Sequence, residues 1–334
     1  MANSRGLVLQ GGGALGAFEL GAARAVYSEK SRFRPDVIAG VSIGAISATL
    51  LARPARRLTP LAALEAFWKA VTSWDPSYWP ATAMVAVPAF YRPSFPPAPF
   101  NTAVYDTSPL LSTLAELIDQ DALKDPAATP RLQMTATEVC AGSLALFDSA
   151  DRKSLPQGLS LKHVLASGSL PPNFPATEID GTAYWDGGVF DNTPLGAVID
   201  ALDGEDPQML VVNLFPKQTP MPTSFAEVMQ TFQNLLFVNK TESDLKLLAR
   251  FNQVVDLVAA LKAEFPPDKL QGLPGWDRLQ KYRRVKDPIQ VTRASEARPL
   301  EGADFSAAGI ARRAAEGQAL TETALKKAGL WDSR

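Results

Sequence analysis

Two glycine-rich turns constrain the fold more than any other feature of the sequence. The first, Gly11-Gly12-Gly13-Ala14-Leu15-Gly16, follows a short apolar run at residues 6–9. The second, Gly40-Val41-Ser42-Ile43-Gly44, closes another apolar run at residues 36–41. A helical stretch rich in Ala, Leu and Ile follows each turn. Strand, glycine turn and helix, repeated in this order, are typical of a parallel α/β sheet, so we predict an α/β fold.

The first turn has the chemistry of an anion site. Backbone N–H groups in a glycine loop at a helix start attract negative charge. The spacing also satisfies G-x-G-x-x-G, the dinucleotide fingerprint, and a nucleotide-dependent oxidoreductase is therefore one alternative. That site needs an acid at the end of the second strand. Asp36 has roughly the right spacing but precedes the strand. The loop therefore favours an oxyanion over a pyrophosphate.

The second turn is G-x-S-x-G between a strand and a helix, the context of a nucleophile elbow. Its glycines permit a strained turn that exposes the Ser42 hydroxyl, and the N–H of Ile43 lies at the helix start. A Gly/Ser helix cap without function is the alternative. Both turns would occur in order by chance in about one chain in a hundred, which favours chemistry.

A nucleophilic serine needs a base, and the composition leaves few choices. The chain holds one histidine, His163, and one cysteine, Cys140, which excludes a multi-His or Cys-rich metal site. A Ser-His-Asp triad would have to use His163, for which a helix residue packed near the core is the alternative. The rival base is Asp186, between Trp185 and a Gly-Gly turn. Burial there would raise its basicity, although an ordinary Asp-Gly turn is the alternative.

Charge and hydropathy narrow the class of protein. The formal net charge is −2 and no block of like charge occurs, which argues against a nucleic-acid partner. The first residues lack the form of a signal peptide, and the longest apolar-rich stretch, residues 37–52, is too short and broken to span a bilayer. We expect a cytoplasmic protein, with peripheral contact with a membrane surface left open.

The remaining sequence suggests two regions. Residues 1–215 are expected to form the α/β core, with an insertion rich in proline and aromatic residues at about 74–105. That insertion either lines an acyl-chain channel or covers the sheet edge. Residues 216–334 are expected to form a mostly helical extension packed on the core, with a late strand at 289–292.

The sequence resembles the bacterial patatin-like phospholipases, or lipid acyl hydrolases. The two glycine turns carry the resemblance, together with Ala166-Ser167-Gly168-Ser169-Leu170-Pro171-Pro172 and Asp186-Gly187-Gly188 followed by Asp191-Asn192-Thr193-Pro194. It implies a three-layer fold, with a mostly parallel central sheet and helices on both faces. It also implies a dyad of Ser42 as nucleophile and Asp186 as base. The chain departs from many members at Leu15, where they carry Arg or Lys.

The resemblance further implies an oxyanion hole and a set of motif glycines. The hole is expected from the N–H groups of Gly11, Gly12, Gly13 and Ile43. The motif glycines are Gly16, Gly40, Gly44, Gly187 and Gly188. We therefore predict a serine hydrolase of lipid ester bonds that works through an acyl-enzyme, without metal or cofactor. A lipid-binding protein without turnover is a further alternative.

Overall fold

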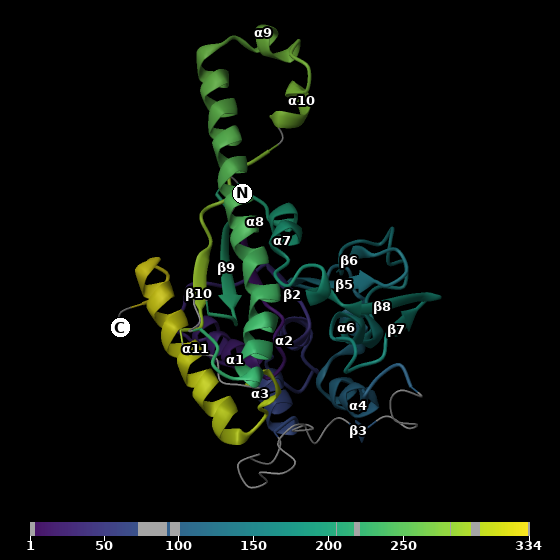
Figure 1. Ribbon diagram of the computed structural model, residues 1–334. Coiled ribbons are helices and arrows are strands. Elements are labelled where there is room, and N and C mark those ends of the chain that lie inside the picture. Colours follow the sequence, from purple (N-terminus) through teal and green to yellow (C-terminus); the bar gives the residue numbers. More distant parts are fainter. Residues whose placement is uncertain are drawn as a thin grey trace.

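The computed structural model describes residues 4–72, 92–93, 101–204, 206–216, 221–280, 282–294 and 301–332. An eight-stranded sheet forms its centre, in the order β10-β9-β1-β2-β5-β8-β7, with β6 paired to β5 (Figure 1). The strands are β1 (Arg5–Leu9), β2 (Val37–Gly40), β5 (Arg131–Glu138), β6 (Ser143–Asp148), β7 (Thr177–Ile179), β8 (Thr182–Asp186), β9 (Gln208–Asn213) and β10 (Ile289–Thr292). A separate two-stranded sheet pairs β3 (Arg92–Pro93) with β4 (Tyr105–Asp106).

Neighbouring strands from β10 to β5 pair in parallel, whereas β6 and β8 run antiparallel to β5. The helices are α1 (Ala17–Val26), α2 (Ile43–Ala52), α3 (Pro60–Ala70), α4 (Ser108–Leu117), α5 (Gln120–Lys124), α6 (Leu161–Ser167), α7 (Leu195–Ala201), α8 (Phe225–Glu264), α9 (Pro267–Gln271), α10 (Trp276–Leu279) and α11 (Ala307–Lys327). Short 3₁₀ turns are η1 (Gly13–Gly16), η3 (Gly187–Val189) and η4 (Glu301–Ala303).

Helices cover both faces of the sheet because both faces are apolar. Successive side chains of a strand point to opposite faces. Leu7 and Leu9 of β1 pack into the larger core with α1, α2 and α3, whereas Val8 packs into a second core with α7. All three side chains are fully buried. The predicted α/β fold, with a mostly parallel sheet and helices on both faces, is confirmed.

The C-terminal third adds to these layers. The late strand predicted at residues 289–292 is confirmed as β10, which pairs in parallel with β9. Helix α11 packs along α1, and the long helix α8 projects beyond the sheet and carries α9 and α10 towards its far end (Figure 1). The division at residue 215 stays a prediction about domains. Among the described residues, no helix is long and apolar enough to cross a membrane.

Helices α1 and α11 approach each other closely at two glycines. A Cβ on Gly317 would overlap the carbonyl of Phe18, and one on Gly21 would overlap the carbonyl of Ala314. Because α1 follows directly on the first glycine turn, this contact anchors that turn to the C-terminal helix.

We predict that Gly317→Ala destabilises the protein by about 1–3 kcal/mol, because the new methyl group has no room. Helix propensity alone would make the alanine variant more stable by about 1 kcal/mol. The sign of the change in unfolding free energy therefore shows whether packing or propensity dominates. Gly196→Ala is the matched control: Gly196 lies in α7 with nothing within 4 Å of an added Cβ. Chemical denaturation should show a loss for Gly317→Ala and a gain for Gly196→Ala, and a gain for both would contradict the close contact.

Candidate active site

Ser42 occupies the sharp turn between β2 and α2. Its backbone angles are φ 56° and ψ −124°, a conformation that side chains rarely adopt and that costs about 1–3 kcal/mol. The turn is tight, since a Cβ on Gly40 would overlap the carbonyl of Gly44, and one on Gly44 would overlap the carbonyl of Leu9. The Ser42 N–H donates to both the carbonyl and the hydroxyl of Ser167, each at 3.1 Å. These bonds hold the Ser42 backbone beyond the end of β2.

Strand β5 determines where Asp186 lies. It pairs in parallel with β2, where Gly40 is opposite Met134, and antiparallel with β8, where Ala136 is opposite Asp186. The last residue of β8 therefore reaches the edge of the sheet at which β2 ends. The Ser42 side chain lies close enough to the Asp186 carboxyl for hydrogen bonding to lower the pKa of that carboxyl.

The Asp186 carboxyl is buried, with only 2% of the residue exposed. Burial raises its pKa to about 6, although hydrogen bonds with the Ser42 hydroxyl and the Gly188 N–H lower it. The bond from the Gly188 N–H to Asp186 Oδ1 measures 2.7 Å. A carboxylate with a pKa near neutrality is a far better proton acceptor than an exposed aspartate.

The segment that follows α6 links the two residues. Ser167 accepts the N–H of Ser42, and the carbonyl of Ser169 accepts the N–H of Asp186 at 3.0 Å. Ser169 is itself held through its hydroxyl, which donates to the carbonyl of Leu165 at 2.9 Å. The family motif at residues 166–172 predicted no role for this segment, because no local pattern shows which strands it bridges.

The four expected oxyanion-hole donors differ in their surroundings. In the described part of the chain, the N–H groups of Gly12, Gly13 and Ile43 have no hydrogen-bond acceptor. The N–H of Gly11, in contrast, is directed to the carbonyl of Asn192 at 3.4 Å, and Asn192 Nδ2 donates to the Gly11 carbonyl at 3.2 Å. Gly11 thus differs from the other three expected donors, because its N–H already has an acceptor.

The remaining motif glycines lie around the same site. Gly16 ends η1 and packs against the Ile43 side chain. Gly187 and Gly188 form the turn η3 directly after Asp186, where Gly187 packs on the backbone of Thr135 and Gly188 on the Asn192 side chain. Asn192 thus touches both the first glycine turn and the turn that carries Asp186, a role that the sequence analysis missed.

His163 lies at the start of α6 and has contacts of its own. Its Nδ1 accepts the Ser160 N–H at 2.9 Å, which completes a capping box, and its ring packs edge-on against Phe147. Burial lowers the pKa of His163. No described contact joins His163 to Ser42 or Asp186. These contacts match the expectation of a helix residue packed near the core.

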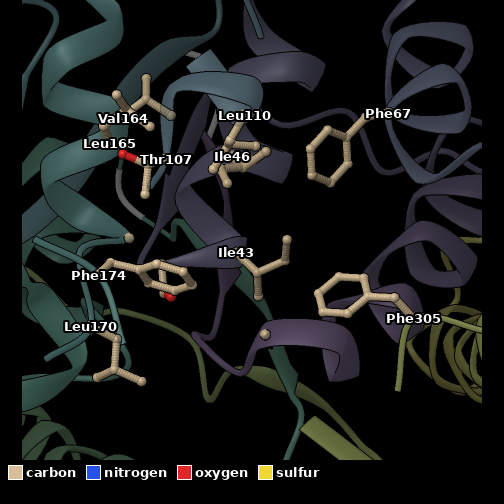
Figure 2. A pocket seen from close by; sticks show the side chains of 13 residues that line it. Ile43, Ile46, Phe67, Thr107, Leu110, Val164, Leu165, Leu170, Phe174 and Phe305 are labelled. Carbon is tan, nitrogen blue, oxygen red and sulfur yellow. The ribbon is translucent and has the colours of Figure 1, made fainter. Parts of the chain in front are cut away.

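An apolar cavity opens beside Ser42 (Figure 2). Gly13, Ser42 and Thr107 supply its polar edge, and the other lining residues are apolar or glycine: Ile43, Ile46, Phe67, Leu110, Val164, Leu165, Gly168, Leu170, Phe174 and Phe305. The acyl-chain channel expected from residues 74–105 involves residues 74–91 and 94–100, which lie outside the described part of the chain.

Asp36, the acid that a dinucleotide site would need, lies away from the first glycine turn. The Asp36 carboxyl accepts the N–H of Arg5 at 2.8 Å, at the opposite end of β1 from the turn. This position agrees with the argument from the sequence against a ribose contact. Within the described ranges, no group of three or more His, Cys, Asp or Glu residues could hold a metal ion.

We predict that Asp186→Asn stabilises the folded protein by up to about 3 kcal/mol at pH 7–8. The folded-state pKa is raised above the ordinary 3.8 to about 6, so the cost to folding grows between pH 3.8 and about 6 and has its full size above pH 6. An amide carries no such penalty. The gain should shrink as pH falls below about 6 and disappear towards pH 4, where the carboxyl becomes protonated in the unfolded state as well.

The measurement is chemical denaturation of the wild type and of Asp186→Asn at several pH values between 4 and 8. Asp148→Asn, measured in the same way, is the matched control. Burial raises the pKa of Asp148, but hydrogen bonds from Arg131 and Gln133 outweigh burial, and the pKa lies below the ordinary value. Asp148→Asn should therefore lose stability at pH 7. An Asp186→Asn protein that is less stable than wild type at every pH would contradict the buried-charge account.

Comparisons with known proteins identify the family of this chain. Residues 7–199 match the sequence profile of the family described as patatin-like phospholipase, a range that includes Ser42 and Asp186. No curated protein gives a significant match. Among solved structures, the crystal structure of VipD from Legionella pneumophila matches with a TM-score of 0.42 and 14% identity, over 98% of this chain and 67% of that chain. Because the profile covers more than half of its length, the chain belongs to the patatin-like phospholipase family of lipid acyl hydrolases.

Proposed function

We propose that the protein hydrolyses carboxylic ester bonds of lipids through a Ser42–Asp186 dyad. The observation that carries this proposal is the position of the buried Asp186 carboxyl, which strand β5 places next to Ser42 at one edge of the sheet. Asp186 accepts the hydroxyl proton as Ser42 Oγ attacks the acyl carbonyl. The proton then passes to the leaving alcohol, and an ester between Ser42 and the acyl group remains. Water, deprotonated by the same carboxylate, releases the acid and restores Ser42.

The oxyanion of each tetrahedral intermediate lies at the first glycine turn in this proposal. The N–H groups of Gly12, Gly13 and Ile43 support it, since they have no acceptor among the described residues. One such donor is worth about 3–4 kcal/mol of transition-state stabilisation in known cases. The N–H of Gly11 is a weaker candidate, because it is directed to Asn192.

The acyl group would lie in the apolar cavity beside Ser42. Hydrocarbon chains gain about 0.8 kcal/mol for each CH₂ that leaves water, so an apolar cavity favours acyl over polar substrates. We also propose that the protein makes transient contact with the surface of a lipid membrane. Exposed apolar side chains at the start of α8 support it: Met221 is 86% exposed and Phe225 81%.

We predict that Ser42→Ala abolishes hydrolysis of p-nitrophenyl esters and of lipid esters, with the fold intact. Ser112→Ala, an exposed serine on α4, is the control and should keep wild-type kcat. Circular dichroism and thermal unfolding establish that both variants fold. A Ser42→Ala protein that still turns over esters would contradict the mechanism, whereas a wild-type protein that binds lipids without turnover would favour the lipid-binding alternative.

We predict that His163→Ala keeps kcat within the same order of magnitude and loses about 1 kcal/mol of stability, because it removes a helix cap. Ser160→Ala breaks the same capping box and should lose a similar amount. Steady-state kinetics on both variants separates the dyad from a triad. A fall in kcat of several orders of magnitude in folded His163→Ala alone would identify His163 as the base.

A further inference from the structure

One wall of the cavity comes from beyond the region that matches the family. Phe305 lies across the cavity from Phe174, with Ile43 between them and Phe67 beside it (Figure 2). The family match ends at residue 199, and Phe305 follows η4 in the C-terminal part of the chain. One residue of the cavity wall therefore lies outside the segment that the family profile describes.

Packing fixes the Phe305 ring. It stacks on Trp68 of α3, with ring centroids 6.1 Å apart and planes at 22°. Phe305 is 6% exposed and Trp68 is 2% exposed. Such a ring cannot turn away without disturbing α3, because interiors are close-packed. The cavity therefore meets a rigid surface on this side.

Backbone contacts join the same segment to the first glycine turn. A Cβ on Gly13 would lie 2.6 Å from the carbonyl oxygen of Gly302, so the two backbones approach as closely as glycine permits. Gly13 itself lines the cavity. The segment that carries Phe305 therefore packs against Gly13, whose N–H is one of the proposed oxyanion donors.

Buried charges hold the segment at both ends. Glu301 binds Arg293 at 2.7 Å and Arg312 at 2.9 Å, and Arg313 binds Asp304 at 3.1 Å. The side chains of Arg293 and Arg313 are 0% exposed. Removing one partner of a buried ion pair is strongly destabilising, so this cluster resists displacement. It ties residues 301–305 to both β10 and α11.

We propose that Phe305 is the end wall of the acyl-chain site and sets the longest acyl chain that the site accepts. This inference rests on the proposed function for its substrate class. The ring is apolar, buried and rigid, and it shares one cavity with Ser42 and Gly13. A chain attached to Ser42 that reaches Phe305 has to end there or bend.

The test compares Phe305→Leu with wild type on p-nitrophenyl esters from C4 to C12. The smaller side chain opens room for about one more CH₂ group, which is worth about fourfold in kcat/KM. The C12-to-C4 ratio of kcat/KM should therefore rise about fourfold. Phe33→Leu is the control, because Phe33 is fully buried but does not line the cavity, and it should leave the ratio unchanged.

A second measurement separates this inference from the proposed function. In the Ser42→Ala background, calorimetry measures the binding of C8 to C16 fatty acids with and without Phe305→Leu, and no turnover is needed. A shift of the tightest-bound acid to a longer chain supports the wall even if the wild-type protein hydrolyses no ester. An unchanged or shortened preference in both measurements, with Phe305→Leu folded, would overturn it.

Discussion

The burial of one carboxyl group beside one hydroxyl group organises this molecule. Asp186 is removed from water beside Ser42, and its pKa rises to about 6 because burial outweighs the hydrogen bonding that favours its charged form. The fold tolerates this charge because β5 fixes its place: one strand pairs with both β2 and β8, so the elbow and the acid meet at one edge of the sheet. Ser167 and Ser169 then hold the two backbones from the side.

The C-terminal part of the chain belongs physically to the same site. Helix α11 packs on α1 at Gly21 and Gly317, and α1 begins at the glycine turn. In the segment of residues 301–305, the Gly302 carbonyl packs closely against Gly13, and the Phe305 side chain lines the cavity. The charge cluster around Glu301 fixes this segment without contributing to the proposed chemistry itself. Residues far from the catalytic motifs in sequence thus shape the space in which an acyl group would lie.

Local features were predictable from the sequence and long-range ones were not. Both strand–turn–helix units were predicted because glycine spacing and apolar runs act over a few residues, and α2 begins and ends where the pattern indicates. The roles of Ser167 and Asn192 escaped prediction, since each depends on partners more than a hundred residues away. The contact of the Gly11 N–H with Asn192 and the place of Phe305 in the cavity also escaped prediction, because both depend on residues that are distant in the sequence. Asp186 was identified from its motif, but only strand register explains its position.

The central claim is that buried Asp186 activates Ser42. The most direct test is the pH dependence of Ser42 acylation, followed as a burst of p-nitrophenol and located by mass spectrometry of the quenched protein. The account predicts an acyl group on the peptide that contains Ser42, formed at a rate that falls as pH drops through about 6, where Asp186 becomes protonated. An acyl group on another residue, or an acylation rate that does not change around pH 6, would contradict it.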